Sequence, residues 1–259
     1  MQIRFASVAV LAIAAGTASA AQVRVTIENT QPTGGFAFTP FWLGFHDNTF
    51  DVFDAGQPSG GGLTEIAELG DTSVITARFD SEQPGGEQTT LFEDTGAPVF
   101  SPGESQSAVF DIDPATQGYL SYASMLVPSN DLFVGNSTAI DLFGGASEIS
   151  SPIVIDVFGI NVYDAGTELN DFSNGPAFVD GVDATGGIGE SNNIQLFLND
   201  PNAQTYLSDI LGTTTANGDT VSLGFNEATL LARITIVPAP GTAGVLALGG
   251  LAAVRRRRG

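Results

Sequence analysis

The sequence has no cysteine and no lysine, and His46 is its only histidine. Without cysteine, disulfides and a cysteine nucleophile are excluded, and a single histidine disfavours a structural zinc site, which needs several Cys or His ligands. A Ser-His-Asp triad would have to use His46, and no serine lies in a G-x-S-x-G motif. Asp47, Asp51 and Asp54 surround His46, so a His-carboxylate dyad or a metal ligand is one hypothesis. A loop histidine that is hydrogen-bonded at the rim of a sandwich is favoured, and we expect no enzyme.

Basic residues are scarce as well: 8 Lys and Arg stand against 29 Asp and Glu, which gives a net charge of −21. Five of the arginines, Arg4 and Arg255–Arg258, lie near the ends of the chain. Residues 21–237 hold all 29 acids and only three arginines, so their formal charge is 3 − 29 = −26. Such a surface repels nucleic acid and anionic lipid and attracts cations. We therefore expect no nucleic-acid partner.

Long apolar runs are found only at the two ends of the chain. Near the N-terminus, Arg4 precedes the apolar stretch Phe5–Ala15, and Ala18-Ser19-Ala20 forms an A-x-A cleavage pattern. The stretch is shorter than the roughly 20 residues that a membrane-spanning helix needs. We expect residues 1–20 to be a signal peptide and the protein to be exported.

The C-terminal residues 238–259 combine a Pro-rich turn, the apolar segment Gly241–Val254 and four consecutive arginines. The positive-inside rule holds such arginines in the cytoplasm with the body of the chain outside. This arrangement resembles the bacterial PEP-CTERM sorting signal, with "PAP" in place of "PEP" because Ala239 stands where the Glu is usual. The resemblance implies transient contact with the inner membrane and processing by an exosortase-type enzyme. A simple tail anchor is the alternative and predicts the same orientation.

Between these ends, residues 21–237 have the pattern of one β-rich domain. The sequence holds 32 Gly and 13 Pro, which favours loops and tight turns over long helices. Strand-like runs are "QVRVTIEN", "SVITARF", "SAVFDI", "YLSYASMLV", "PIVIDVFGI" and "LLARITIV". Short helices are predicted at "GLTEIAEL" and "NAQTYLSDIL", each followed by a glycine. We predict an all-β fold, an antiparallel β-sandwich with one or two short helices.

The segment "VYDAGTELND" gathers four oxygen-bearing side chains, Asp164, Thr167, Glu168 and Asp171, with no basic residue nearby. Gly166 relaxes the backbone, so a tight turn can bring Asp164 and Glu168 inward. Calcium takes about six to eight oxygen ligands from carboxylates, carbonyls and water. These residues alone leave three interpretations: a solvated acidic loop, a catalytic carboxylate pair or a cation site. Composition favours the acidic loop.

A second segment, "SMLVPSNDLFVGN", resembles the spondin N-terminal domain, whose motif contains Pro-Ser-Pro-Asp-Trp-Phe-Val-Gly. The matching residues are Pro128, Ser129, Asp131, Phe133, Val134 and Gly135, whereas Asn130 and Leu132 replace the second Pro and the Trp. In that family an Asp-Ala-Gly-Thr-Asp motif follows, which here is Asp164–Glu168. Upstream, "TPFWLGFHD" and "FDAGQPSGGGLTEIAELGD" are similar to segments of bacterial members. The resemblance extends from about Val23 to Ile236.

The resemblance implies a C2-like β-sandwich with one calcium ion held by loops at one end. The family's ligands fall on Asp131, Asp164 and Glu168 of this sequence. Glu168 is one methylene longer than the family's Asp, so its loop must lie slightly farther back. Leu132 in place of Trp concerns packing or a surface contact, and the disulfides of animal members are absent.

For function, the resemblance implies a non-enzymatic, calcium-binding protein of the cell surface or extracellular matrix. Its role would be in adhesion, biofilm or exopolysaccharide-associated matrix, with a polysaccharide or protein partner that the sequence does not identify. One alternative is a carbohydrate-binding module in which Phe41, Trp42 and Phe50 stack on sugar rings. The alternation of Phe41, Leu43 and Phe45 favours a core strand instead. The second alternative is a hydrolase that uses carboxylates around His46.

Overall fold

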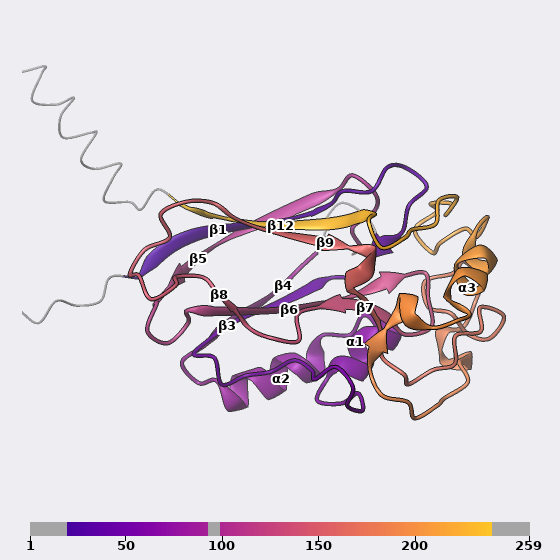
Figure 1. The fold of residues 1–259 in the computed structure, drawn as a ribbon, viewed down its shortest axis with the longest axis horizontal. Coiled ribbons are helices and arrows are strands. Elements are labelled where there is room, and N and C mark those ends of the chain that lie inside the picture. The colour runs from indigo at the N-terminus through magenta and orange to yellow at the C-terminus, as the bar shows by residue number, and fades with distance from the viewer. Residues whose placement is uncertain (1–19, 93–98, 240–259) are drawn as a thin grey trace, which may run out of the picture.

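Residues 20–92 and 99–239 are described here from a computed structural model (Figure 1). Their strands form two antiparallel sheets that pack face to face, and short helices cover the outer face of the larger sheet. The core between the sheets is built from alternate residues of the strands, as expected for a sandwich. The predicted all-β sandwich is therefore confirmed.

The smaller sheet has the strand order β5-β1-β12-β9. Its strands are β1 (Ala21–Asn29), β5 (Ser105–Ile112), β9 (Ile153–Phe158) and β12 (Leu230–Pro238). In β1, Val23, Val25 and Ile27 are buried against the second sheet, whereas Arg24 and Glu28 are exposed. This period of two is what places one face of the sheet in the core.

The larger sheet runs in the order β11-β10-β7-β6-β3-β4, and β2 and β8 also pair with β6. Its strands are β2 (Ala37–Phe38), β3 (Phe41–His46), β4 (Glu87–Leu91), β6 (Tyr119–Val127), β7 (Leu132–Gly135), β8 (Ile140–Asp141), β10 (Val162–Asp164) and β11 (Gln195–Leu196). Every residue of β3 is buried. Both faces of the sheet are therefore covered at β3.

Three α-helices lie within the described ranges: α1 (Leu63–Leu69), α2 (Ser73–Glu82) and α3 (Ala203–Ile210). Helices α1 and α2 cover the outer face of the larger sheet, and α3 lies at the end of the sandwich near β7 (Figure 1). A second apolar cluster joins α1 and α2 to this face and includes Trp42, Ile66 and Phe79. Short 3₁₀ turns at Gly159–Asn161, Ala184–Gly186 and Phe197–Asn199 complete the elements.

The strand predicted at "SVITARF" is wrong, because this stretch forms α2. The Ser73 N–H donates to Asp71 Oδ1 at 2.8 Å, which supports the start of the helix. Ile75 and Phe79, four residues apart, are buried on one helical face, and Val74 is exposed. The β-branched residues in the stretch gave a strand signal that this packing overrides.

Candidate functional site

Asp131 and Asp164 come together because β7 and β10 are neighbours. Asp131 directly precedes β7, and Asp164 is the last residue of β10. The two strands run antiparallel, with Asp164 opposite Leu132. The register therefore brings two carboxylates to the same end of the larger sheet, although 32 residues of chain lie between them.

The two carboxylate oxygens of Asp131 have different environments. Oδ2 accepts hydrogen bonds from the Thr167 N–H (2.8 Å), the Glu168 N–H (3.0 Å) and the Thr167 hydroxyl (3.2 Å). Oδ1 is buried and has no hydrogen-bond partner. Asp131 thus ties the segment 164–168 to the start of β7 and leaves one carboxylate oxygen without a donor.

The Asp164 carboxylate stabilises the turn that follows it through two hydrogen bonds. Its Oδ1 accepts from the Gly166 N–H at 2.7 Å, and its Oδ2 accepts from Asn170 Nδ2 at 2.7 Å. Gly166 has φ +69°, and a Cβ there would lie 2.7 Å from the Asn192 carbonyl oxygen. Glycine is therefore required at this turn, as its place in the predicted motif suggested.

Glu168 lies at the edge of the same site. It is 9% exposed and forms a β-bridge with Gly189. Its carboxylate lies directly over Gly187, where an added Cβ would collide with it. Glu168 is therefore held against segment 187–189, while its backbone N–H binds Asp131.

Burial makes the ionised forms of all three acids unfavourable. Burial, and then the charge of Asp164, raises the pKa of Asp131 to about 7. Burial raises the pKa of Asp164, and burial followed by the charge of Glu68 raises the pKa of Glu168 to about 7. A nearby cation would favour the ionised forms, so the electrostatics suit a positively charged ligand.

Tyr206 of α3 supports the loop that contains Asp131, through hydrogen bonds to Asn130. The Tyr206 hydroxyl accepts from the Asn130 N–H and donates to Asn130 Oδ1, both at 2.8 Å. Asn130 Nδ2 in turn donates to the Asn174 carbonyl at 2.9 Å. Sequence reasoning missed this support: Tyr206 looked like an ordinary apolar helix position, and Asn130 looked like a mere replacement of proline.

The donor set fits a hard cation in part. Carboxylate oxygens are what calcium prefers, and Asp131 Oδ1 is an unpartnered one. Within the described residues, however, no group of three or more His, Cys, Asp or Glu side chains is close enough to hold a metal ion. The register of β7 and β10 brings Asp131 and Asp164 together, whereas the Glu168 carboxylate packs over Gly187.

His46 has a structural environment. It is fully buried, its Nδ1 accepts from the Asn48 N–H at 3.1 Å, and its Nε2 lies 3.0 Å from Ser121 Oγ. The first bond places the ring proton on Nε2, which then donates to the serine. Burial lowers the pKa of His46 to about 4, so the ring is neutral near pH 7. The favoured interpretation of a hydrogen-bonded histidine agrees with this geometry, but the predicted loop is wrong, because His46 is the last residue of strand β3 and is fully buried.

The aromatic residues considered for sugar stacking are inaccessible. Phe41 and Trp42 are 0% exposed and Phe50 is 3% exposed. Trp42 packs edge-on against Phe79 of α2, with ring centroids 5.4 Å apart. The core-strand interpretation of "FTPFWLGF" is therefore right, but both faces of the strand are buried and not only the Phe41 face.

Two of the sequence predictions concern segments outside the described residues, namely most of the signal peptide and the C-terminal sorting segment. In the part of the chain that the structure describes, no helix has the length and apolar character needed to span a membrane.

Comparison with known proteins agrees with the motif geometry. A search of curated proteins finds no match. The Spondin_N family model matches residues 24–183, which is well over half of the chain and includes Asp131, Asp164 and Glu168. The match begins in β1 and ends beyond β10, so it covers both strands that carry the site. This match, which agrees with the sandwich fold and the paired motifs, shows that the chain belongs to the Spondin_N family.

Proposed function

We propose that this chain is an exported, non-enzymatic protein of the cell surface or extracellular matrix, and that its sandwich binds one calcium ion. Membership of the Spondin_N family suggests the extracellular setting. The proposed ligands are Asp131, Asp164 and Glu168, and the proposed role is in adhesion or in a biofilm or exopolysaccharide-associated matrix.

The observation that carries the calcium proposal is the lone Oδ1 of Asp131. A buried carboxylate oxygen without a donor is costly, because it has lost its hydration and gained nothing. Asp164 lies beside it and adds a second negative charge. A divalent ion bound there would satisfy the oxygen and offset the repulsion.

The remaining ligands must come from the surrounding segments. Calcium accepts backbone carbonyls and water as readily as carboxylates, and it tolerates irregular geometry. Glu168 supplies a third carboxylate if its side chain leaves the surface over Gly187. Binding would thus hold together segments 128–131 and 164–168, which already share the hydrogen bonds of Asp131.

Calcium titration by calorimetry tests this proposal. We expect one saturable site in the wild type, with a dissociation constant on the order of 0.1–1 mM, as in extracellular calcium modules. Asp131→Asn should abolish it, because the variant keeps the shape of the side chain and removes the charge. Asp183→Asn is the matched control: it removes the same charge from an exposed loop where Asp183 accepts the Thr185 N–H. Diffuse binding that is equal in all three proteins would refute the site.

We propose further that residues 1–20 direct export and that residues 238–259 act as a sorting signal cut by an exosortase-type enzyme. The apolar segment and the arginines would hold the chain transiently at the inner membrane. In bacteria with an exosortase, the full chain should reach the cell surface as a shortened product. A variant that ends at Val237 should be released into the medium, and identical fractionation of the two would contradict the proposed signal.

A further inference from the structure

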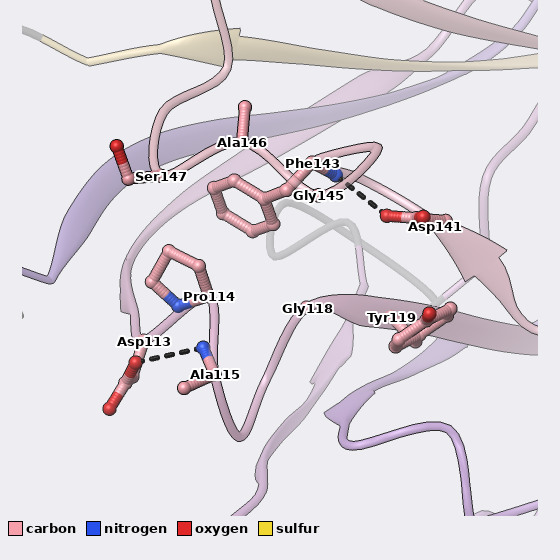
Figure 2. A pocket seen from close by; sticks show the side chains of 10 residues that line it. All are labelled: Asp113, Pro114, Ala115, Gly118, Tyr119, Asp141, Phe143, Gly145, Ala146 and Ser147. Carbon is pink, nitrogen blue, oxygen red and sulfur yellow. Dashed lines mark hydrogen bonds between the residues drawn. The ribbon is translucent and has the colours of Figure 1, made fainter.

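A pocket of about 410 Å³ (Figure 2) lies at the end of the sandwich that is opposite α3 in Figure 1. It is formed by the loop that joins β5 to β6 and by the segment that follows β8. Pairing of Tyr119 with Asp141 and a 2.9 Å bond from the Leu142 N–H to the Gly118 carbonyl hold the two segments together. The proposed calcium site lies beyond the other end of β6, so the two sites are separate.

The lining of this pocket is mostly apolar. Phe143, Pro114, Ala115 and Ala146 supply carbon surface, and Tyr119 presents its ring from the start of β6 (Figure 2). Gly118 passes close to both walls: a Cβ there would lie 2.7 Å from the Pro114 carbonyl and 3.7 Å from the Phe143 ring. The walls therefore suit the methylene groups of an extended side chain.

Two carboxylates flank this apolar surface, Asp113 beside Pro114 and Asp141 beside Tyr119 (Figure 2). Asp113 Oδ1 accepts the Ala115 N–H at 2.9 Å. Asp141 Oδ1 accepts the N–H groups of Phe143 (3.0 Å) and Gly144 (2.8 Å). In each case the backbone fixes the carboxylate, and Oδ2 has no hydrogen bond within the described residues. Each side chain is thus held in place with one acceptor oxygen available.

Within the part of the chain that the structure describes, no basic side chain pairs with these two carboxylates. None of the lining residues is basic, and the sequence contains no lysine. The lining offers two hydroxyl donors, on Tyr119 and Ser147, but no amide side chain. Sugar recognition generally combines several donors and acceptors in a pocket, whereas this pocket combines acidic acceptors with aromatic and aliphatic walls. Such surroundings select an apolar stem that ends in a positive charge.

From this complementarity we infer that the pocket binds a basic side chain, Lys or Arg, of a partner polypeptide. The stem lies against Phe143 and Pro114, and the charged head meets Asp141 and the face of Tyr119. The strongly acidic body of the chain steers such a partner toward it, whatever ion the other end binds. This inference does not depend on the calcium site.

The test uses the full chain, labelled with ¹⁵N, and the peptide acetyl-Gly-Lys-Gly-amide as probe. Its neutral analogue carries norleucine, which keeps the aliphatic stem and lacks the charge. At matched ionic strength, the Lys peptide should produce saturable shifts of the backbone amides in segments 113–118 and 141–147. The norleucine peptide should produce none over the same concentration range.

Two variants and one control make the test specific. Asp141→Asn keeps a side-chain oxygen for Phe143 and Gly144 and should weaken Lys-peptide binding about fivefold, the upper range for one partly exposed ion pair. Ala146→Trp should block the pocket, with the rest of the spectrum showing a folded chain. Asp183→Asn, with the same loss of charge elsewhere, should change the affinity less than twofold.

Three outcomes would overturn the inference. Shifts that are spread over all acidic surfaces and unaffected by Asp141→Asn would show only nonspecific attraction. Equal binding of the norleucine peptide would show an apolar pocket without charge selection. Binding of n-butylammonium without binding of the Lys peptide would identify a small amine, not a polypeptide, as the ligand.

Discussion

At the scale of single residues, the structural role of Asp131 prepares the side chain for the binding role that we propose for it. Its Oδ2 is saturated by three donors from Thr167 and Glu168, whereas its Oδ1 has none. The saturated oxygen fixes where the free one points. A ligand bound by Oδ1 therefore meets a carboxylate that the fold has already oriented, and little side-chain entropy is left to lose on binding.

His46 leads to a prediction about pH. The pKa of this histidine falls from 6.5 to about 4 on folding because the ring is buried. The unfolded chain therefore binds more protons than the folded chain between these two pH values, and stability must fall as the pH drops from about 6.5 to 4. Two and a half pKa units correspond to about 3 kcal/mol as an upper value.

Urea denaturation of the wild type and of His46→Gln at several pH values from 4 to 7.5 checks this prediction. The wild type should lose about 2–3 kcal/mol more than the variant over this range. Because both proteins share the same carboxylates, the titration of those groups cancels in the difference. Parallel pH profiles would show that His46 is not held in its neutral form by the fold.

At the scale of elements, the strands at the centre of the sheets were predictable and the packing between elements was not. The alternation of Val23, Val25 and Ile27 identified β1, and Gly70 marked the end of α1 with φ +68°. The strand signal of α2 was misleading, because its β-branched residues pack as a helix over the larger sheet. Only the tertiary structure shows that α2 covers Trp42 of β3, because the two elements are separated in the sequence.

The same limit applies to the candidate site. Asp131, Asp164 and Glu168 were identified through motif resemblance, and the register of β7 and β10 explains the meeting of the first two. The contact between Tyr206 and Asn130 spans 76 residues and left no local pattern to detect. The position of Glu168 over Gly187 depends likewise on the long segment that follows β10.

Helix α3 gives the prediction at this scale, through the substitution Tyr206→Phe. The variant leaves the buried N–H and Oδ1 of Asn130 without a partner, which should lower the free energy of unfolding by about 2–3 kcal/mol. Because Asn130 precedes Asp131, calcium affinity should also fall by about tenfold, as for other residues that position metal ligands.

Tyr163→Phe is the control for this substitution, since the Tyr163 hydroxyl makes no hydrogen bond within the described part of the chain and its ring lies next to Phe133. Thermal unfolding and calorimetry on both variants separate the two effects. If Tyr206→Phe loses stability yet binds calcium like the wild type, α3 supports the fold without positioning the ligand loop.

At the scale of the whole molecule, charge is the dominant feature. The formal net charge of the chain is −21, and of its eight arginines only Arg24, Arg78 and Arg233 belong to the sandwich. Two of them are already engaged: Arg233 binds Asp156 at 2.6 Å, and Arg78 lies over the Phe50 ring at 4.3 Å. The folded state therefore concentrates negative charge with little internal compensation, which lowers its stability.

Salt and calcium should stabilise this molecule in two separable ways. With EDTA present, the melting temperature should rise steadily between 20 mM and 1 M NaCl, because the screening length shrinks from roughly 20 Å to about 3 Å. At fixed ionic strength, calcium should add a further, saturable increase that magnesium does not match and that Asp131→Asn lacks. Differential scanning calorimetry measures the rise in melting temperature with NaCl and the further rise with calcium.

A melting temperature that does not change with NaCl would mean that the carboxylates are too dispersed for their repulsion to affect folding. An equal response to calcium and magnesium in wild type and variant would reduce the role of calcium to screening.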